Sequence, residues 1–126
     1  MRSDGVPPDE QLQKDAPSAM ISTSAVQLLH EYTGRGPTKA KTVISEDLVT
    51  ILVADTLTRG ERKLVDNDDA DEVLQLRHHY QRIMRAELVA VVERQLERKV
   101  IAFMSQNHIA PDLAVEVFVL EPTETT

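Results

Sequence analysis

The stretch LAVEVFVL at residues 113–120 decides the fold class, because its side chains alternate as they do in a β-strand. A second strand is predicted just before it, from Val100 to Ser105. A long helical run, from Asp69 to about Arg98, precedes both strands. A long amphipathic helix that leads into two adjacent strands predicts a compact α+β domain, built for packing rather than for reaction chemistry.

The long helix is predicted to carry one apolar stripe over about eight turns, or on the order of 40 Å. We expect this stripe to lie across the sheet, and the overhanging part of the helix could meet a second subunit. The stripe consists of Val73, Leu76, Tyr80, Ile83, Met84, Leu88, Val91, Val92 and Leu96. The opposite face is predicted to carry Arg77, Arg82, Arg85, Glu93, Arg94 and Glu97.

The two ends of the chain differ in composition from its middle. Residues 1–17 are polar, acidic and contain three prolines, which predicts a disordered acidic tail. A helix is predicted from Ser18, as its N-cap, to Thr33, because apolar residues recur there at spacings of three and four. We therefore expect a single domain over residues 18–121 and a flexible tail over residues 122–126.

A hairpin is predicted after the first helix. One short arm runs from Lys41 to Ile44, the turn covers residues 45–47, and the second arm runs from Leu48 to Ala54. The second arm is almost continuously apolar and rich in β-branched residues, which predicts an interior strand covered on both faces. A helix over residues 45–57 is the alternative that the sequence leaves open.

A short helix is predicted from Thr58 to about Val65. Thr58 and Glu61, three residues later, have the spacing of a capping box, in which each side chain binds the other residue's backbone N–H. The acidic run that follows, residues 66–69, is predicted to end this helix and to cap the long helix through Asp69.

These elements predict a two-layer α+β sandwich in the order α-β-β-α-α-β-β. About four mostly antiparallel strands form the sheet, and the long helix and the first helix pack on one of its faces. The other face is predicted to include Ile101, Phe103, Phe118 and Leu120, depending on the register. If that face is apolar and bare it must meet another subunit, so we expect a homodimer.

The composition excludes several classes of protein. Cysteine is absent, so there is no disulfide framework and no cysteine metal site. The net charge of −7 disfavours binding to nucleic acid, which depends on neutralising phosphates, and to an anionic membrane surface. No segment approaches the roughly 20 apolar residues that span a bilayer, and the N-terminus lacks the apolar region of a signal peptide. We expect a cytoplasmic protein without direct membrane insertion.

No motif in the chain has the spacing of a catalytic, cofactor or metal site. The acidic run from Asp66 resembles a calcium loop, but its sixth residue is Asp71 rather than glycine and its twelfth is Arg77 rather than glutamate. His78 and His79 are adjacent, so on a helix they point about 100° apart and cannot share a metal ion. We therefore predict no catalytic residues, no cofactor and no metal site.

A basic turn remains as a candidate for binding. Gly34, Arg35, Gly36, Pro37 and Lys39 look a little like a phosphate loop, but the spacing is wrong and no strand precedes them. Their ordinary role is to end a helix and turn the chain. Because these residues form a basic corner in an acidic chain, they could also dock a carboxylate, a phosphate or an acidic partner.

Several segments together are similar to the MpsC-like family of small bacterial proteins, long catalogued as a domain of unknown function. The resemblance covers about residues 19–122 and rests on the order and spacing of its motifs. These are EYTGRGP (31–37), Asp47-Leu48, Leu57-Thr58 with Glu61 and Leu64, RKVIAFMS (98–105) and DLAVEVFVLEP (112–122). The Gly-Arg-Gly-Pro turn and the closing strand together are fairly specific.

The resemblance implies a function that the residues alone do not give. The family is associated with a sodium-translocating, membrane-potential-generating system, so the resemblance implies a soluble, non-enzymatic accessory protein of cation or inorganic-carbon transport with an integral-membrane partner. The basic turn and the polar face of the long helix would be its docking surfaces. The alternative is a small cytosolic sensor that binds an anionic ligand at the Gly34–Pro37 turn, and an enzyme is the least favoured.

Overall fold

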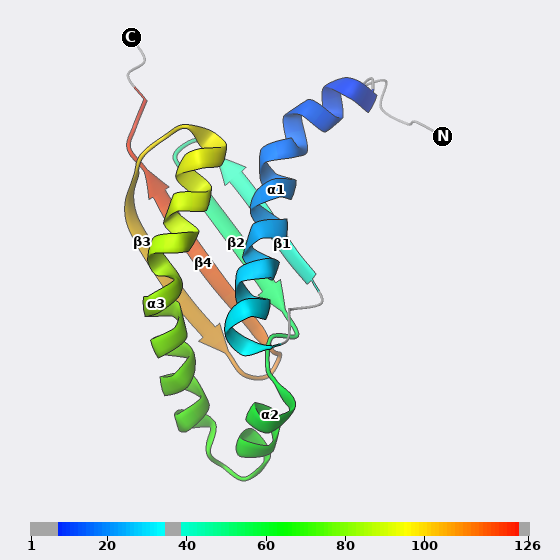
Figure 1. The fold of residues 1–126 in the computed structure, drawn as a ribbon, viewed down its shortest axis with the longest axis vertical. Helices are drawn as coiled ribbons and strands as arrows, with labels where there is room; N and C mark the ends of the chain where they lie inside the picture. The colour runs from blue at the N-terminus through cyan, green and yellow to red at the C-terminus, as the bar shows by residue number, and fades with distance from the viewer. Residues whose placement is uncertain (1–7, 35–38, 124–126) are drawn as a thin grey trace.

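The structure of the protein is a computed structural model that describes residues 8–34 and 39–123, with side chains from residue 17 onward. Within these ranges three helices and four strands follow the predicted order α-β-β-α-α-β-β, which confirms the α+β fold class (Figure 1). The elements are α1 (Pro8–Thr33), β1 (Lys39–Ser45), β2 (Leu48–Ala54), α2 (Arg59–Asp66), α3 (Ala70–Leu96), β3 (Val100–His108) and β4 (Leu113–Leu120).

The four strands form one antiparallel sheet with the strand order β1-β2-β4-β3. β2 and β4 are therefore interior strands, and β1 and β3 are the two edges. Residues that are paired across antiparallel strands point to the same face of the sheet. One row of such residues joins Val43, Thr50, Val117 and Met104 across all four strands.

Most strand boundaries agree with the sequence analysis. β2 and β4 begin and end at the predicted residues, and the alternative helix over residues 45–57 does not form. β1 is longer than predicted at both ends. β3 continues three residues past Ser105, and a β-bulge interrupts its register with β4 between Val100 and Ala102.

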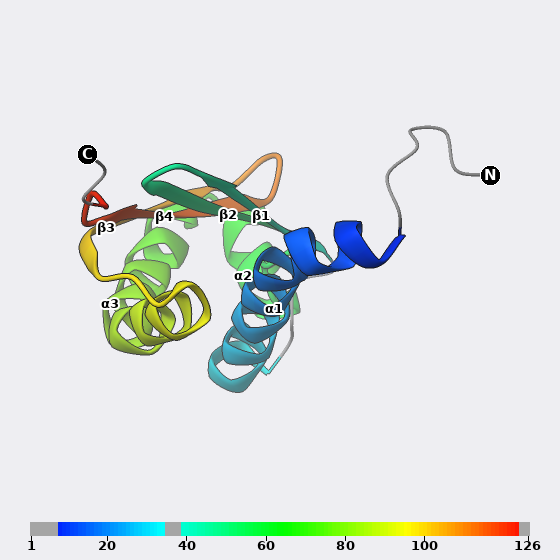
Figure 2. The same ribbon diagram turned by 90° about the horizontal axis from the view of Figure 1, so that it is seen from above.

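The hydrophobic core lies between the sheet and two helices. α1 and α3 lie side by side on the same face of the sheet, as predicted (Figure 2). Burying these apolar side chains is the main favourable contribution to folding. The fully buried side chains are Ile21 from α1, Val49, Ile51 and Val53 from β2, Val73, Met84 and Val92 from α3, and Phe118 and Leu120 from β4.

The opposite face of the sheet is not covered by any described element, and two predictions about it were wrong. β2 was predicted to be covered on both faces, yet Leu48 and Leu52 are more than 40% exposed. Phe118 and Leu120, predicted on the bare face, lie under the helices with the partly buried Phe103. The register decides this, because every second residue of β4 from Ala114 onward points to the core.

α1 starts at Pro8 rather than at Ser18, so the predicted start was wrong by ten residues. Residues 8–17, which were assigned to the tail, are helical in the structure, and residues 1–7 lie outside the described part. Pro17 lies inside the helix, and the ribbon changes direction in its N-terminal half (Figures 1 and 2). A proline in a helix interior removes one backbone hydrogen bond and clashes with the preceding turn, which accounts for a bend.

α2 is fixed by the predicted capping box. The Glu61 backbone N–H donates to Thr58 Oγ1 at 3.1 Å, and the Thr58 N–H donates to Glu61 Oε1 at 2.7 Å. Asp69 lies at the N-cap position of α3 as predicted, but its side chain makes no capping hydrogen bond. The capping prediction is therefore confirmed for α2 and wrong in its detail for α3.

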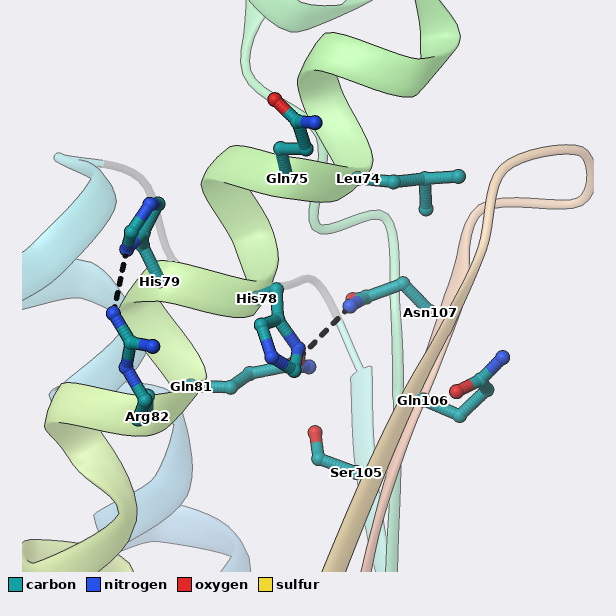
Figure 3. A pocket seen from close by; sticks show the side chains of 9 residues that line it. All are labelled: Leu74, Gln75, His78, His79, Gln81, Arg82, Ser105, Gln106 and Asn107. Carbon is teal, nitrogen blue, oxygen red and sulfur yellow. Dashed lines mark hydrogen bonds between the residues drawn. The ribbon is translucent and has the colours of Figure 1, made fainter.

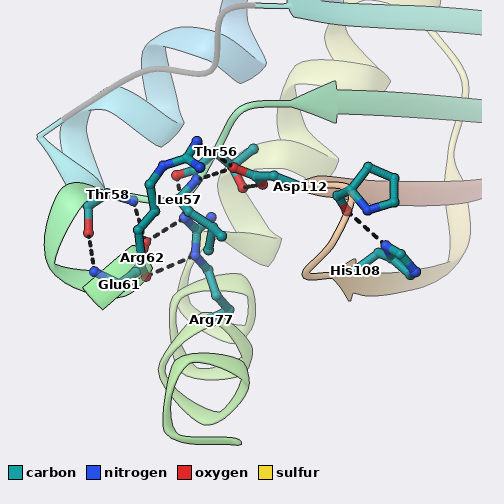
Figure 4. A network of polar contacts seen from close by, with 9 residues as sticks. Thr56, Leu57, Thr58, Glu61, Arg62, Arg77, His108 and Asp112 are labelled. Atoms are coloured by element: carbon teal, nitrogen blue, oxygen red, sulfur yellow. Dashed lines mark hydrogen bonds and ion pairs between the residues drawn. The ribbon is translucent and has the colours of Figure 1, made fainter. Parts of the chain in front are cut away.

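A buried ion pair joins α2 to α3 (Figure 4). Arg77 Nε donates to Glu61 Oε2 at 3.0 Å and Arg77 Nη2 donates to Glu61 Oε1 at 2.7 Å, and the guanidinium also donates to the Thr56 carbonyl. Arg77 is only 3% exposed, so its assignment to the solvent face of the long helix was wrong. A charged group is found inside a protein when a partner compensates its lost hydration, as Glu61 does here.

Asp112 ties the end of β2 to the β3–β4 turn beside this pair. Its carboxylate accepts from Thr56 Oγ1 and from the Leu57 N–H, both at 2.9 Å, and from Arg62 Nη2 at 3.4 Å (Figure 4). Polar side chains at this end of the molecule are therefore engaged in holding loops together.

Candidate functional site

The structure describes only part of the basic turn that the sequence suggested. Gly34 ends α1 with a positive φ of 73°, and its N–H donates to the His30 carbonyl at 2.8 Å, which is the ordinary role of a helix-ending glycine. Lys39 is exposed at the start of β1. Arg35, Gly36 and Pro37 lie outside the described residues, so an anion site at this turn stays a prediction.

The bare face of the sheet forms a continuous apolar surface, which we call the open face. It consists of the outward-pointing residues of all four strands, whose positions follow from the pairing register. Its apolar members are Val43, Leu48, Leu52, Ala54, Ala102, Met104, Leu113, Val115, Val117 and Val119. Monomeric proteins seldom leave so many adjacent apolar side chains in water, which makes the open face a candidate interaction surface.

The lysine and histidine side chains of the open face lie at its margins. Lys39 and Lys41 project from the edge strand β1, and His108 projects from the end of the other edge strand, β3. None of the outward-pointing strand residues is an aspartate or a glutamate, although the chain has 21 of these. An acidic chain thus presents one large surface on which no strand residue is acidic.

A second feature is the groove between α3 and β3, which we call the α3–β3 groove (Figure 3). Its largest hollow has a volume of about 650 Å³. His78 and Gln81 point from α3 toward Asn107 on β3, while His79 and Arg82 form the outer rim (Figure 3). Two smaller hollows, of about 270 and 290 Å³, continue the groove along β3 past Phe103.

The α3–β3 groove carries two arginines and two histidines. His78, His79, Arg82 and Arg85 line its three hollows, and none of the lining residues is an aspartate or a glutamate. Arg82 Nη2 lies 3.0 Å from His79 Nδ1, and the Arg85 guanidinium lies 5.8 Å from the centre of the Phe103 ring. A cation over an aromatic face is attracted by the ring, so Phe103 helps to hold the Arg85 guanidinium beside β3.

A buried carboxyl group lies behind the α3–β3 groove. Glu116 is only 5% exposed, and its Oε2 accepts from Gln81 Nε2 at 3.4 Å, while Gln81 Oε1 accepts from Asn107 Nδ2 at 3.0 Å. Glu116 Oε1 and the cross-strand Ser105 Oγ have no hydrogen-bond partner in the described part of the chain. Burial raises the pKa of Glu116 to about 7, because the charged form loses its hydration.

Neither Glu116 nor Arg77 was singled out by the sequence analysis. The signal for Glu116 was present, because it shares the parity of Ala114 and Phe118 in a strand whose other inward residues are apolar. A carboxylate at an inward position of a strand is buried unless the assignment of inward and outward residues is itself wrong. The signal for Arg77 was its helical spacing, because it lies four residues after Val73 and seven before Met84, which are both buried.

The described residues hold no group of three or more His, Cys, Asp or Glu side chains that could bind a metal ion. Among the helices at residues 8–33, 59–66 and 70–96, none is both long and apolar enough to cross a membrane.

Comparison with known proteins gives one match. A family model described as "Na+-translocating membrane potential-generating system (MpsC)" matches residues 13–122, which is most of the chain. No curated protein sequence matches the chain, and no solved structure matches it. The match runs from residue 13, within α1, past the end of β4 and therefore includes both the open face and the α3–β3 groove.

Proposed function

This chain belongs to the MpsC family, and on that premise we propose that it is a non-enzymatic accessory subunit of a Na⁺-translocating, membrane-potential-generating system. Membership of the family suggests that the chain is a component of such a system. That the component is a non-enzymatic accessory subunit is a further step. The observation that carries this step is the open face, which has the composition of a protein interface. The buried polar groups around Glu61, Arg77 and Asp112 support it, because they are engaged in joining elements.

The occupant of the open face is a second copy of the same chain. Four strands about 4.8 Å apart, with seven to nine residues each, give a face of roughly 20 by 25 Å. Two such faces in contact would bury on the order of 1,000–1,500 Å², which is the lower part of the range for stable interfaces. Two antiparallel sheets that pack face to face through alternating apolar side chains form an ordinary sandwich core.

The charge distribution supports a homodimer through the open face. Two chains with a net charge of −7 repel one another over most of their surfaces. The outward-pointing residues of the strands include no carboxylate, and Lys39 and Lys41 lie at one margin. The open face is therefore a surface on which the two chains can approach with little like-charge repulsion.

The partner in the membrane is an integral membrane protein of the transport system. A chain with this net charge is repelled by an anionic leaflet, so direct binding to lipid is unfavourable. In this proposal the protein resides in the cytoplasm and reaches the membrane through its protein partner. The polar face of α3, including the α3–β3 groove, remains available to that partner when two open faces are in contact.

The proposed function is tested by the membrane potential of cells that lack this protein. Na⁺-dependent potential, measured with a potential-sensitive dye, should fall in such cells and return with the wild-type chain. Val117→Lys, which places a charge in the middle of the open face, should fail to restore it. Met20→Lys makes the same kind of change on an exposed residue of α1, outside the open face and the α3–β3 groove, and should restore it. An unchanged potential in the absence of the protein would refute the proposal.

A further inference from the structure

β3 is a long edge strand, and its β-bulge, between Val100 and Ala102, is confined to its first residues. It has nine residues and pairs only with β4 among the described strands, so its outer backbone groups are free to pair with another chain. Proteins often protect such edges with lysine or proline, and β1 carries Lys39 and Lys41. β3 carries neither lysine nor proline, and only His108, at its last position, is titratable.

The α3–β3 groove runs along this edge on the side of the sheet that α3 covers. A strand added beside β3 would continue the sheet, and every second side chain of it would point toward α3. Those side chains would enter the groove that Ser105 and Asn107 line from β3 and that His78 and Arg82 line from α3. The edge would bind the backbone, and the groove would select the side chains.

The two groove arginines lie at a spacing close to that of alternate residues of an extended chain. Arg82 and Arg85 follow one side of α3, and with a rise of 1.5 Å per residue they are about 4.5 Å apart along the helix. Alternate side chains of a strand are about 6.7 Å apart. Arginine pairs well with carboxylates, so carboxylates at alternate positions can each reach a cation.

We propose that the outer edge of β3 and the α3–β3 groove together bind an extended peptide segment of another protein that carries carboxylates at alternate positions. This inference rests on the proposed function in one respect, since it describes the segment that a transport partner presents. It uses a different surface from the homodimer, so the two can be tested separately. A small anion is a poorer fit, because the cations are spread over three connected hollows rather than gathered around one point.

The test measures the binding of a fluorescent peptide, acetyl-Glu-Val-Glu-Val-Glu-Val-Glu-amide, by anisotropy at low ionic strength. The wild-type chain should bind this peptide and not its counterpart with lysine in place of glutamate. The double variant Arg82→Gln/Arg85→Gln should bind at least about fivefold more weakly, because each exposed ion pair contributes modestly. The double variant Arg59→Gln/Arg94→Gln removes the same charge from exposed arginines that do not line the groove, and should bind like the wild type.

Strand addition is tested with two N-methylated versions of the peptide, one methylated at the odd-numbered amides and the other at the even-numbered amides. Each version is unable to form backbone hydrogen bonds along one of its two edges. The inference requires that one of the two methylation patterns abolishes binding and the other does not. Equal binding of both patterns would overturn it, and so would competition by glutarate at the concentration of the peptide, which would indicate a small-anion site. Val117→Lys should bind the peptide normally. A failure of peptide binding therefore leaves the homodimer test untouched.

Discussion

At the scale of single residues, Glu116 is the most unusual group in the protein. It occupies an inward position of β4 between apolar neighbours, and the Gln81 amide donates to its Oε2 at 3.4 Å. Arg77 and Tyr80 of α3 line the same small cavity, but the guanidinium of Arg77 is engaged by Glu61. The carboxyl group is therefore held in a place that favours its neutral form.

Glu116 should make the stability of the protein depend on pH. Its pKa is raised from an ordinary 4.5 to about 7, so the folded state holds a proton that the unfolded state has lost. The proton on Glu116 stabilises the folded state fully below about pH 4.5, and this stabilisation is lost as the pH rises through 7. Glu116→Gln, which stays neutral, should unfold like the wild type at pH 4.5. At pH 8.5 it should be more stable by on the order of 3 kcal/mol in urea denaturation. Equal stability at pH 8.5 would contradict this account.

The buried ion pair should be costly to break from one side. Arg77→Gln leaves Glu61 buried without a charged partner and should destabilise the fold by about 3 kcal/mol, measured by urea denaturation. Arg62 is exposed and lies 3.4 Å from Asp112, so Arg62→Gln should cost less than about 1 kcal/mol. Equal losses of the free energy of unfolding in the two variants would show that burial does not determine how much these ion pairs contribute to stability.

At the scale of elements, the sequence analysis predicted the helices and strands whose sequence patterns are local. The β-branched run of β2, the alternation of β4 and the capping box of α2 each depend on neighbouring residues, and the structure confirms them. The start of α1 was missed because a tail rich in polar residues and proline reads as disordered. The end of β3 was missed because Gln106, Asn107 and His108 have low strand propensity and are held by pairing with β4.

The two helix caps offer a matched comparison. Thr58→Ala removes a capping hydrogen bond at the start of α2 and should lower the free energy of unfolding by about 1 kcal/mol. Asp69→Ala changes the same position of α3, where the side chain makes no capping bond, and should cost only a few tenths of a kcal/mol through the helix dipole. Thermal denaturation of both variants checks this, and a larger loss for Asp69→Ala would reverse the assignment.

At the scale of the whole molecule, the strand order and the choice of buried face lay beyond the sequence. β4 lies between β2 and β3, so a long-range pairing determines which strands become edges. Phe118 and Leu120 were placed on the bare face because apolar residues occur at both parities of β4, and only packing against α1 and α3 decides between them. The candidate surfaces depend on these same long-range contacts, which is why neither the position of the open face nor the α3–β3 groove was predicted by residue.

The same view of the molecule shows why the open face is the main candidate for an interaction. One layer of helices buries one face of the sheet, and no described element covers the second face. The central claim is that a second copy of the same chain covers this face. It follows from the apolar composition of the open face and from its lack of acidic residues in a chain with a net charge of −7.

The mass of the protein in solution, measured by light scattering after size-exclusion chromatography, tests this claim most directly. The wild-type chain and Met20→Lys should have twice the mass of one chain. Val117→Lys should have the mass of one chain and keep the far-UV circular dichroism of the wild type. A single-chain mass for the wild-type protein at high concentration would contradict the account.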